Sequence, residues 1–211
     1  MILHGYFRSS AAYRVRIALH LKGLEVEHRF VHLRRGEQRS EAYRQINPQA
    51  LVPTLEVADR RIAQSLAIIE YLEERHPLPP LLPPGAEDRA WVRSIALAIA
   101  CDIHPLDNTR VLQYLEGTLG VDAARRDAWY AHWIAEGFRA IERQLGERAG
   151  GRYAFGDEPG LADVCLVPQV ANAARVKLDM APYPRIRAVN EACLAHPAFD
   201  RARPEKQPDA E

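Results

Sequence analysis

The chain has 211 residues, a length typical of one or two domains, and its 28 basic and 28 acidic residues give a formal net charge of zero. This balance argues against general binding to nucleic acid or to an anionic membrane, and a content of 47% hydrophobic and 27% charged residues excludes a disordered or collagen-like chain. No apolar run approaches the ~18 residues of a membrane span, and residues 1–7 lack the basic start of a secretory signal.

The first eighty residues alternate short strand and helix patterns. The apolar periodicity predicts four strands, at 2–7, 26–31, 54–57 and 61–63. It predicts three helices between and after them, at 12–22, 41–46 and 66–75. Gly23 is a stop signal after the first helix, and Ser65 is placed to cap the last one. This order predicts one small α/β layer structure, which we assign to residues 1–80.

Residues 77–85 contain five prolines in nine positions, a stiff and extended run that helices rarely cross. We interpret this run as an interdomain linker rather than a surface loop, because strand patterns almost vanish after residue 86. The later periodicity predicts helices at 87–119 (broken or bent near His104-Pro105), 123–148, 161–174, 184–195 and 197–203, before a polar tail at 204–211 that is frayed or draped over the surface. Residues 86–211 are therefore expected to form an all-helical domain.

The three cysteines, Cys101, Cys165 and Cys193, are widely spaced and form no CxxC pair. They fit neither a disulfide framework nor a zinc site, so we expect no metal and a reducing, cytoplasmic setting. The first eighty residues contain no cysteine, which argues against a thioredoxin-type oxidoreductase.

The turn between the first strand and the first helix contains two consecutive serines, Ser9 and Ser10, after Arg8. A helix N-terminus offers free N–H groups and a partial positive charge, which favour an anion. A serine there can cap the helix, or its hydroxyl can donate to a bound thiolate. Two serines leave room for both functions.

This turn and the helix after it resemble the signature of zeta-class glutathione transferases, a family that includes the maleylacetoacetate and maleylpyruvate isomerases. The resemblance starts with the run FRSSAAYRVRIAL and extends to Gln207-Pro208-Asp209; its matching stretches are 7–19, 47–55, 64–74 and 162–173. It implies a thioredoxin-like N-terminal domain, an all-α C-terminal domain, glutathione as cofactor and a homodimer. A maleyl-type dicarboxylate keto acid is the implied substrate, with no nucleic-acid or membrane partner.

The resemblance also implies roles for individual residues. Ser9 or Ser10 would activate the thiolate beside Arg8, a cis Val52-Pro53 bond would aim the Val52 backbone at glutathione, and Ser65 would hold the γ-glutamyl carboxylate. The remaining glutathione-binding positions are Ala11, Gln38, Pro53, Gln64, His104, Asn108, Thr109 and Arg110, and the substrate-binding arginines are Arg8, Arg110 and Arg175. These residue types also have ordinary structural roles. Pro53 could simply start an edge strand, and the serines could cap their helices. His104 could sit at a helix bend bonded to a backbone carbonyl, and the arginines could be surface residues.

Two positions depart from the family pattern. Ala11 stands where members of the class often have cysteine, which excludes a mechanism that needs a protein thiol at this position. Gly160 stands where the helix near Asp163 usually opens with serine or threonine. Glycine is a slightly weaker N-cap, so we expect a small loss of stability there.

The implied activity is glutathione-dependent cis–trans isomerisation of maleylacetoacetate to fumarylacetoacetate, a step of tyrosine and aromatic breakdown. A thiolate adds reversibly to the conjugated alkene, the resulting single bond rotates, and elimination gives the trans product. Three alternatives are a maleylpyruvate isomerase, a zeta-type transferase acting on haloacids and other electrophiles, and a non-catalytic glutathione-binding protein. Three arginines that can each grip a carboxylate favour the isomerases.

Overall fold

The structure, a computed structural model that describes residues 1–148 and 150–211, divides into two compact units. Unit 1 comprises Met1–Leu81 and Ala195–Glu211, and unit 2 comprises Leu82–Leu194. None of the described helices combines the length and the apolar character of a membrane span.

Unit 1 is built on a four-stranded mixed sheet with the strand order β2-β1-β3-β4. The strands are β1 (Ile2–Gly5), β2 (Glu27–Phe30), β3 (Thr54–Val57) and β4 (Arg60–Ala63). β1 pairs with β2 in parallel, whereas β3 is antiparallel to both β1 and β4. A parallel pair needs a crossover, and helix α1 (Ser10–Leu21) supplies it between β1 and β2. This is the α/β arrangement that the alternating pattern predicts.

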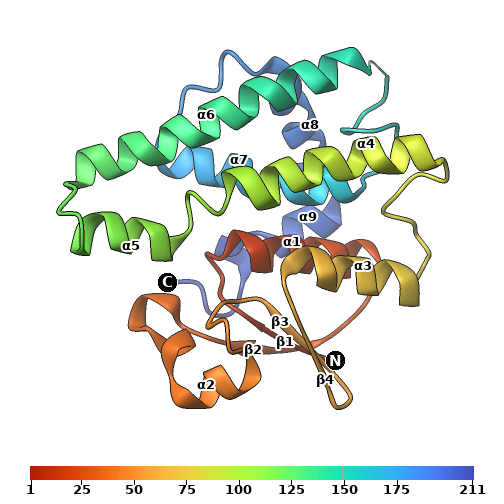
Figure 1. Cartoon of the computed structure of the whole chain (residues 1–211). Helices are drawn as coiled ribbons and strands as arrows, with labels where there is room; N and C mark the ends of the chain where they lie inside the picture. The colour runs from red at the N-terminus through yellow and green to blue at the C-terminus, as the bar shows by residue number, and fades with distance from the viewer. Residues whose placement is uncertain (149) are drawn as a thin grey trace. The chain divides into compact units, whose positions relative to one another are not determined.

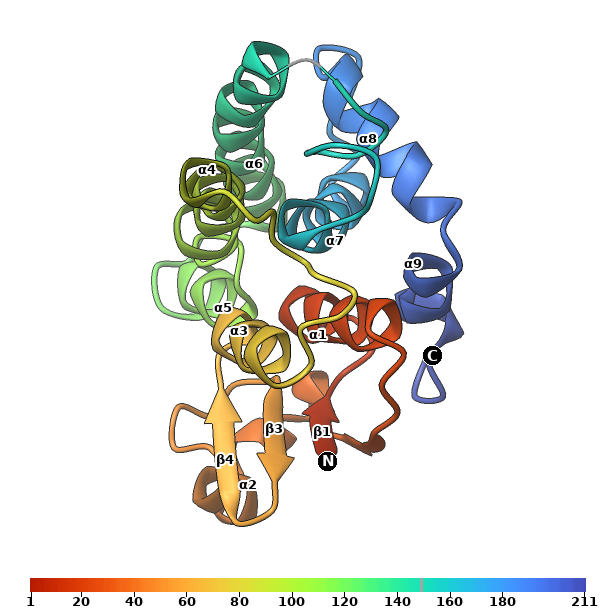
Figure 2. The same cartoon turned by 90° about the vertical axis from the view of Figure 1, so that its right-hand side faces the viewer.

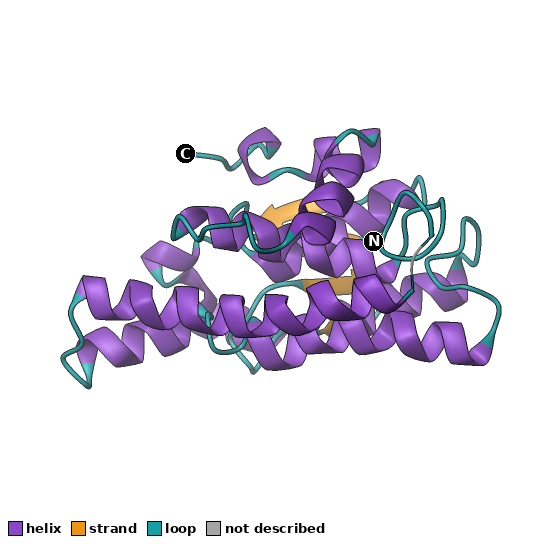
Figure 3. Ribbon diagram, turned by 90° about the horizontal axis from the view of Figure 1, so that it is seen from above, coloured by secondary structure: helices purple, strands orange, loops and turns teal. Residues whose placement is uncertain are grey.

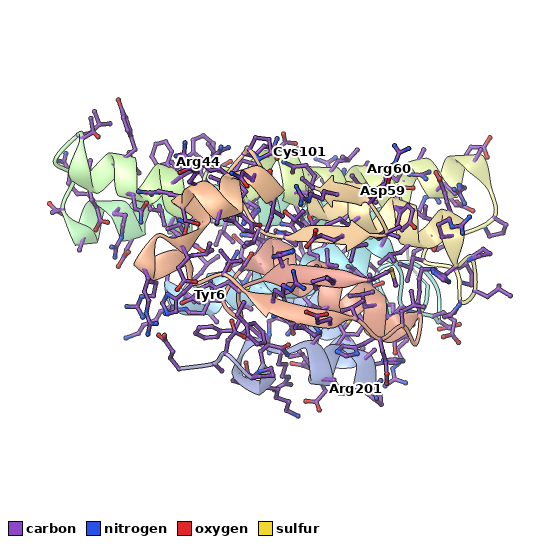
Figure 4. All side chains as sticks on the ribbon, turned by 90° about the horizontal axis from the view of Figure 1, so that it is seen from below. Tyr6, Arg44, Asp59, Arg60, Cys101 and Arg201 are labelled. Carbon is purple, nitrogen blue, oxygen red and sulfur yellow. The ribbon has the colours of Figure 1, made fainter. Side chains whose placement is uncertain are left out.

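The helices of unit 1 cover both faces of this sheet. In Figures 1 and 2, α1 and α3 (Ser65–Arg75) lie side by side over one face, while α2 (Glu41–Ile46) lies on the other side. The two 3₁₀ turns before α2 are η1 (Leu33–Arg35) and η2 (Glu37–Arg39). Figure 4 shows the sheet from the opposite side, with Arg44 on α2 and Asp59 and Arg60 at the β3–β4 turn.

The segment after Leu194 was expected to complete the helical domain, but the structure places it in unit 1. Its helix α9 (Pro197–Ala202) packs on α1 and buries Phe199 and Ala202 completely. A short turn, η4 (Pro204–Lys206), follows. The apolar face of α9 therefore joins the core beside α1, and the polar tail is draped over unit 1 rather than frayed.

All the regular secondary structure that the structure describes in unit 2 is helical, as the purple ribbons of Figure 3 show. Its elements are α4 (Ala86–Leu97), the π-helical segment η3 (Ala98–Ile103), α5 (Thr109–Gly117), α6 (Ala123–Glu147), α7 (Leu161–Arg175) and α8 (Pro184–Leu194). Helix α7 contacts α4, α6 and α8, and most of its side chains are buried. At its start, Asp163 Oδ2 accepts a hydrogen bond from Gly160 N at 2.9 Å, so the expected glycine cap is present.

The first helical stretch of unit 2 is interrupted earlier than the sequence predicts. The expected break near His104-Pro105 is present, but the helix already changes to π-helical geometry at Ala98. Gly137 on α6 packs closely against the end of this segment. A Cβ at this position would lie only 2.1 Å from Ile103 Cδ1. A π-helical turn widens the backbone locally, a change that apolar periodicity does not reveal.

Candidate functional site

Three loops of unit 1 leave the same end of the sheet. In the antiparallel pairs, Thr54 of β3 lies opposite both His4 of β1 and Ala63 of β4. The residues that follow β1, that precede β3 and that follow β4 therefore meet at one edge. These residues include Ser9, Val52 and Ser65, so the topology brings together the unit 1 segments predicted to hold glutathione.

The turn after β1 is shaped by Ser9, which occupies the N-cap position of α1. Ser9 Oγ accepts a hydrogen bond from Ala12 N at 3.2 Å, and Ser9 N donates to Tyr6 O at 3.0 Å. The capping bond uses a lone pair of the hydroxyl oxygen, so the hydroxyl proton can be donated to another acceptor. Arg8 is exposed, Ser9 and Ala11 are half-buried, and Ser10 is buried.

The segment before β3 has the expected cis Val52-Pro53 bond. Its neighbours are fixed by side chains of α2 and the following turn: Tyr43 Oη and Asn47 Nδ2 each donate to Leu51 O at 2.8 Å. Val52 shares a buried apolar cluster with Tyr6 and Phe7, which places it beside the turn that carries Ser9.

The start of α3 differs from the expectation that Ser65 is its N-cap. Gln64 occupies the cap position with a φ of 73° and makes no capping bond with its side chain; Ser65 is the first helical residue. The buried Ser65 Oγ instead accepts a hydrogen bond from Arg14 Nη1 at 3.2 Å. Gln64 Nε2 donates to Gln49 Oε1 at 2.8 Å.

Gln38, on η2, carries an unmet hydrogen-bond acceptor. Its side chain is 7% exposed, and its buried Oε1 has no hydrogen-bond partner among the described residues. An unpaired buried amide oxygen is costly, and a ligand N–H donor would satisfy it. This observation fits the predicted use of Gln38 in ligand binding.

In unit 2, four of the predicted residues lie in one turn. His104 directly follows η3 and donates its backbone N–H to Ile99 O at 2.9 Å. Asn108 caps α5, because its Oδ1 accepts a hydrogen bond from Arg110 N at 3.1 Å. Thr109 and Arg110 open α5 and are exposed. Arg175, also exposed, is the last residue of α7.

A buried carboxylate that the sequence analysis did not single out connects this turn to α7. Asp107 is 4% exposed, and its Oδ2 accepts from Gln169 Nε2 at 3.2 Å. Burial raises the pKa of Asp107 to about 7, because a single amide donor compensates little of the lost hydration. Its Oδ1 has no hydrogen-bond partner among the described residues. The sequence showed an acidic residue in this turn but not its burial.

Comparison with known proteins agrees with this arrangement. Residues 8–75 match the family model of the glutathione S-transferase N-terminal domain, and residues 123–192 match that of the C-terminal domain. A probable maleylacetoacetate isomerase of Vibrio cholerae is 50% identical over 100% of this chain and 98% of its own length. The chain belongs to the glutathione S-transferase family.

Solved structures place this glutathione S-transferase in the zeta class. A holo maleylpyruvate isomerase, described as a bacterial zeta-class glutathione S-transferase, superposes with a TM-score of 0.97 at 48% identity, and all of both chains is covered. A maleylacetoacetate isomerase from Methylobacterium extorquens AM1, solved with bound malonate and glutathione, gives a TM-score of 0.96 at 39% identity, again over 100% of both chains. The predicted architecture of a thioredoxin-like unit and an all-helical unit is thereby confirmed.

A cavity of about 460 Å³ in this glutathione S-transferase lies elsewhere in unit 1. It contains none of the predicted ligand-binding residues; its lining is Arg16, Leu19, His20, Gly23, Leu24, Glu25, Val26, His28 and Arg201. Burial lowers the pKa of both His20 and His28, with a further decrease from nearby arginines. Among the described residues, no group of three or more His, Cys, Asp or Glu side chains is arranged to hold a metal ion.

Proposed function

We propose that this chain is a glutathione-dependent cis–trans isomerase that converts maleylacetoacetate to fumarylacetoacetate. The observation that carries the proposal is the convergence of Ser9, Val52 and Ser65 at one edge of the sheet, in a chain with full-length zeta-class relatives. The residues present fit glutathione: a hydroxyl at a helix N-terminus, the cis Val52-Pro53 segment before β3 and a buried acceptor without a partner at Gln38.

In this proposal, the backbone of Val52 pairs with the cysteinyl part of glutathione, as an added strand would. The N-terminus of α3 and the Ser65 hydroxyl bind the γ-glutamyl carboxylate, because free N–H groups and the helix dipole favour an anion there. The acceptor of Gln38 takes a ligand N–H. Packing within unit 1 holds Val52, and a hydrogen bond from Arg14 holds Ser65.

Ser9 is the proposed donor to the sulfur. Its half-buried hydroxyl accepts the capping bond and keeps its proton for donation, whereas Ser10 is buried within the first turn of α1. Bound glutathione supplies the thiolate that adds reversibly to the alkene, so that rotation can occur before elimination. A free thiol of pKa ~8.5 is only about 3% ionised at pH 7, so lowering its pKa by ~2 units makes the thiolate the main form.

The proposed substrate-binding groups are Arg8 in unit 1 and Arg110 and Arg175 in unit 2. Guanidinium groups bind carboxylates in bidentate fashion and stabilise the negative charge that develops on an enolate oxygen. Malonate, the ligand named with one zeta-class neighbour, is itself a dicarboxylate. We therefore assign the substrate class as dicarboxylate keto acids with a cis alkene.

A second candidate substrate within this class is maleylpyruvate. It is favoured by the similarity to a maleylpyruvate isomerase over the whole of both chains. The two substrates share the cis alkene and both carboxylates, so the same residues would serve either reaction.

A spectroscopic isomerisation assay tests the proposal. Purified protein is compared with and without glutathione on maleylacetoacetate and on maleylpyruvate, which both carry two carboxylates. We expect glutathione-dependent turnover, faster with maleylacetoacetate. Preferential turnover of maleylpyruvate selects the second candidate, and turnover of haloacids alone with bound glutathione contradicts the isomerase assignment.

We further propose that the protein works as a homodimer in the cytoplasm, in the breakdown of tyrosine or related aromatic compounds. The support for a homodimer is that twofold dimers are the commonest assembly among soluble homo-oligomers. Light scattering on the purified protein measures the assembly, and a monomeric mass at working concentrations contradicts it.

A further inference from the structure

The C-terminal tail of unit 1 binds the backbone of the turn that carries Ser9. Phe7 N donates a hydrogen bond to Asp209 Oδ2 at 2.9 Å, although the two residues are 202 positions apart. Phe7 is 6% exposed, so its amide has little access to water and depends on this acceptor. Asp209 thus holds the residue immediately before Arg8 and Ser9.

Arg16 also binds the backbone of this turn. Its guanidinium donates to Phe7 O at 3.1 Å and to Tyr6 O at 3.4 Å, and its Nε donates to Ala202 O at 3.1 Å. Burial lowers the pKa of Arg16 to about 10, an effect that nearby Tyr13 and Asp209 oppose, so the side chain is charged at neutral pH. Hydrogen bonds from a charged donor are the stronger kind.

The tail itself is held in place where it delivers Asp209. Gln207 Nε2 donates to Arg201 O at 2.9 Å and to Arg203 O at 2.8 Å, which folds the tail back onto the end of α9. Beyond Asp209, Glu211 pairs with His32, whose ring lies 5.2 Å from that of Tyr6. Figure 4 shows Tyr6 following β1 and Arg201 on α9.

Hydrogen bonds from within the turn and from these two outside groups together fix its backbone. Tyr6 O accepts from both Ser9 N and Arg16, Phe7 N donates to Asp209, and Phe7 O accepts from Arg16. The position of the Ser9 hydroxyl follows from that of Tyr6 and Phe7, because only Arg8 separates them.

We propose that Asp209 and Arg16 are positioning residues, which hold the β1–α1 turn so that the Ser9 hydroxyl and the N-terminus of α1 are aimed at the sulfur of bound glutathione. This inference rests on the proposed function of Ser9. It gives the C-terminal tail a part in catalysis through the turn that it holds.

The test compares Asp209→Ala and Asp209→Asn with the wild-type full chain. The ultraviolet absorbance of the thiolate, followed against pH, reports the pKa of bound glutathione. For Asp209→Ala we expect a thiol pKa raised toward that of free glutathione and a kcat about tenfold lower, because small displacements at a reacting centre are costly, with the KM for glutathione nearly unchanged. Asparagine keeps an acceptor oxygen, so Asp209→Asn should restore most of both values.

Asp59→Asn is the matched control, because Asp59 is exposed at the β3–β4 turn and pairs with Arg60 rather than with the turn that carries Ser9 or with the tail. Hydrogen exchange at the Phe7 amide should accelerate in Asp209→Ala and not in the control. An Asp209→Ala protein with the wild-type thiol pKa and kcat overturns the inference, as does a loss of both that asparagine does not rescue. If the wild type binds glutathione but isomerises nothing, the proposed function fails, and the thiol pKa still decides on the positioning role.

Discussion

The Ser65 hydroxyl at the start of α3 accepts a hydrogen bond from Arg14 Nη1 of α1 across 3.2 Å. Arg14 is 1% and Ser65 5% exposed, so this bond between two helices is sheltered from water. It occupies a lone pair of the hydroxyl oxygen and leaves the proton for a ligand carboxylate.

Replacement of Ser65 should therefore affect both binding and stability. We expect Ser65→Ala to weaken glutathione binding about tenfold and to lower the unfolding free energy by about 1–3 kcal/mol, because Arg14 loses a buried acceptor. Calorimetric titration and urea unfolding measure the two effects. Ser94→Ala, which removes an exposed hydroxyl on α4, is the control. Unchanged affinity with reduced stability would limit Ser65 to a structural role.

Replacement of Ser9 separates capping from catalysis. We expect Ser9→Ala to lower kcat about 10²- to 10³-fold, the usual effect of losing one donor to a developing or bound anion. Glutathione affinity should change little, and the lost cap should lower stability by about 1 kcal/mol.

Ser40 provides the matched control for that experiment. Ser40 caps α2 by accepting from Tyr43 N at 3.2 Å, the same distance as in the Ser9 cap. Ser40→Ala should reproduce the stability loss with normal steady-state kinetics. Full activity in Ser9→Ala, with a loss in Ser10→Ala, would transfer the donor role to Ser10.

The three arginines should matter only for charged substrates. Hydrogen bonds to charged groups contribute about 1.5–3 kcal/mol, so leucine at Arg8, Arg110 or Arg175 should lower kcat/KM for a maleyl substrate about 10- to 100-fold. Conjugation of glutathione to an uncharged alkyl halide should stay within about twofold. Arg143→Leu, at an exposed site on α6, is the control. Equal losses on both substrates would argue against carboxylate binding.

Asp107 predicts a pH dependence of stability. Its pKa is about 7 in the folded protein and close to ~3.9 in an unfolded chain, so the folded state holds the extra proton and stability falls as pH rises from about 4 to about 7. Asp107→Asn removes the buried charge and should gain about 1–3 kcal/mol over wild type at pH 8, but little near pH 4. Urea unfolding at both pH values measures this difference. The exposed Asp102→Asn is the control, and a variant that is less stable than wild type at pH 8 would contradict the burial argument.

Local signals in the sequence were sufficient for most elements. The short helix at 41–46 and the strand at 54–57 occur at the predicted residues, because Asn47-Pro48 ends the helix and Pro53 precedes the strand. The serines at the N-terminus of α1 and the proline-rich run were likewise visible as short patterns. The ligand-binding positions in unit 1 were predicted from the resemblance to zeta-class glutathione transferases.

What the sequence did not reveal depends on contacts between distant residues. Ser65 looked like a cap because its partner, Arg14, lies 51 positions earlier in the chain. The tail looked like part of the helical domain because its polar residues carry no sign of the bond between Asp209 and Phe7. The burial of Asp107 is set by α7, which packs over it from far along the chain.

Unit 1 is assembled from the two ends of the chain, with unit 2 inserted between them. During synthesis, α9 and the tail are made after every residue of unit 2. The surface of α1 that α9 covers therefore stays open to water until residues 195–211 have been made. A premature stop codon shortly before that point would leave the inserted unit whole and would deprive the glutathione-binding unit of its last structural element.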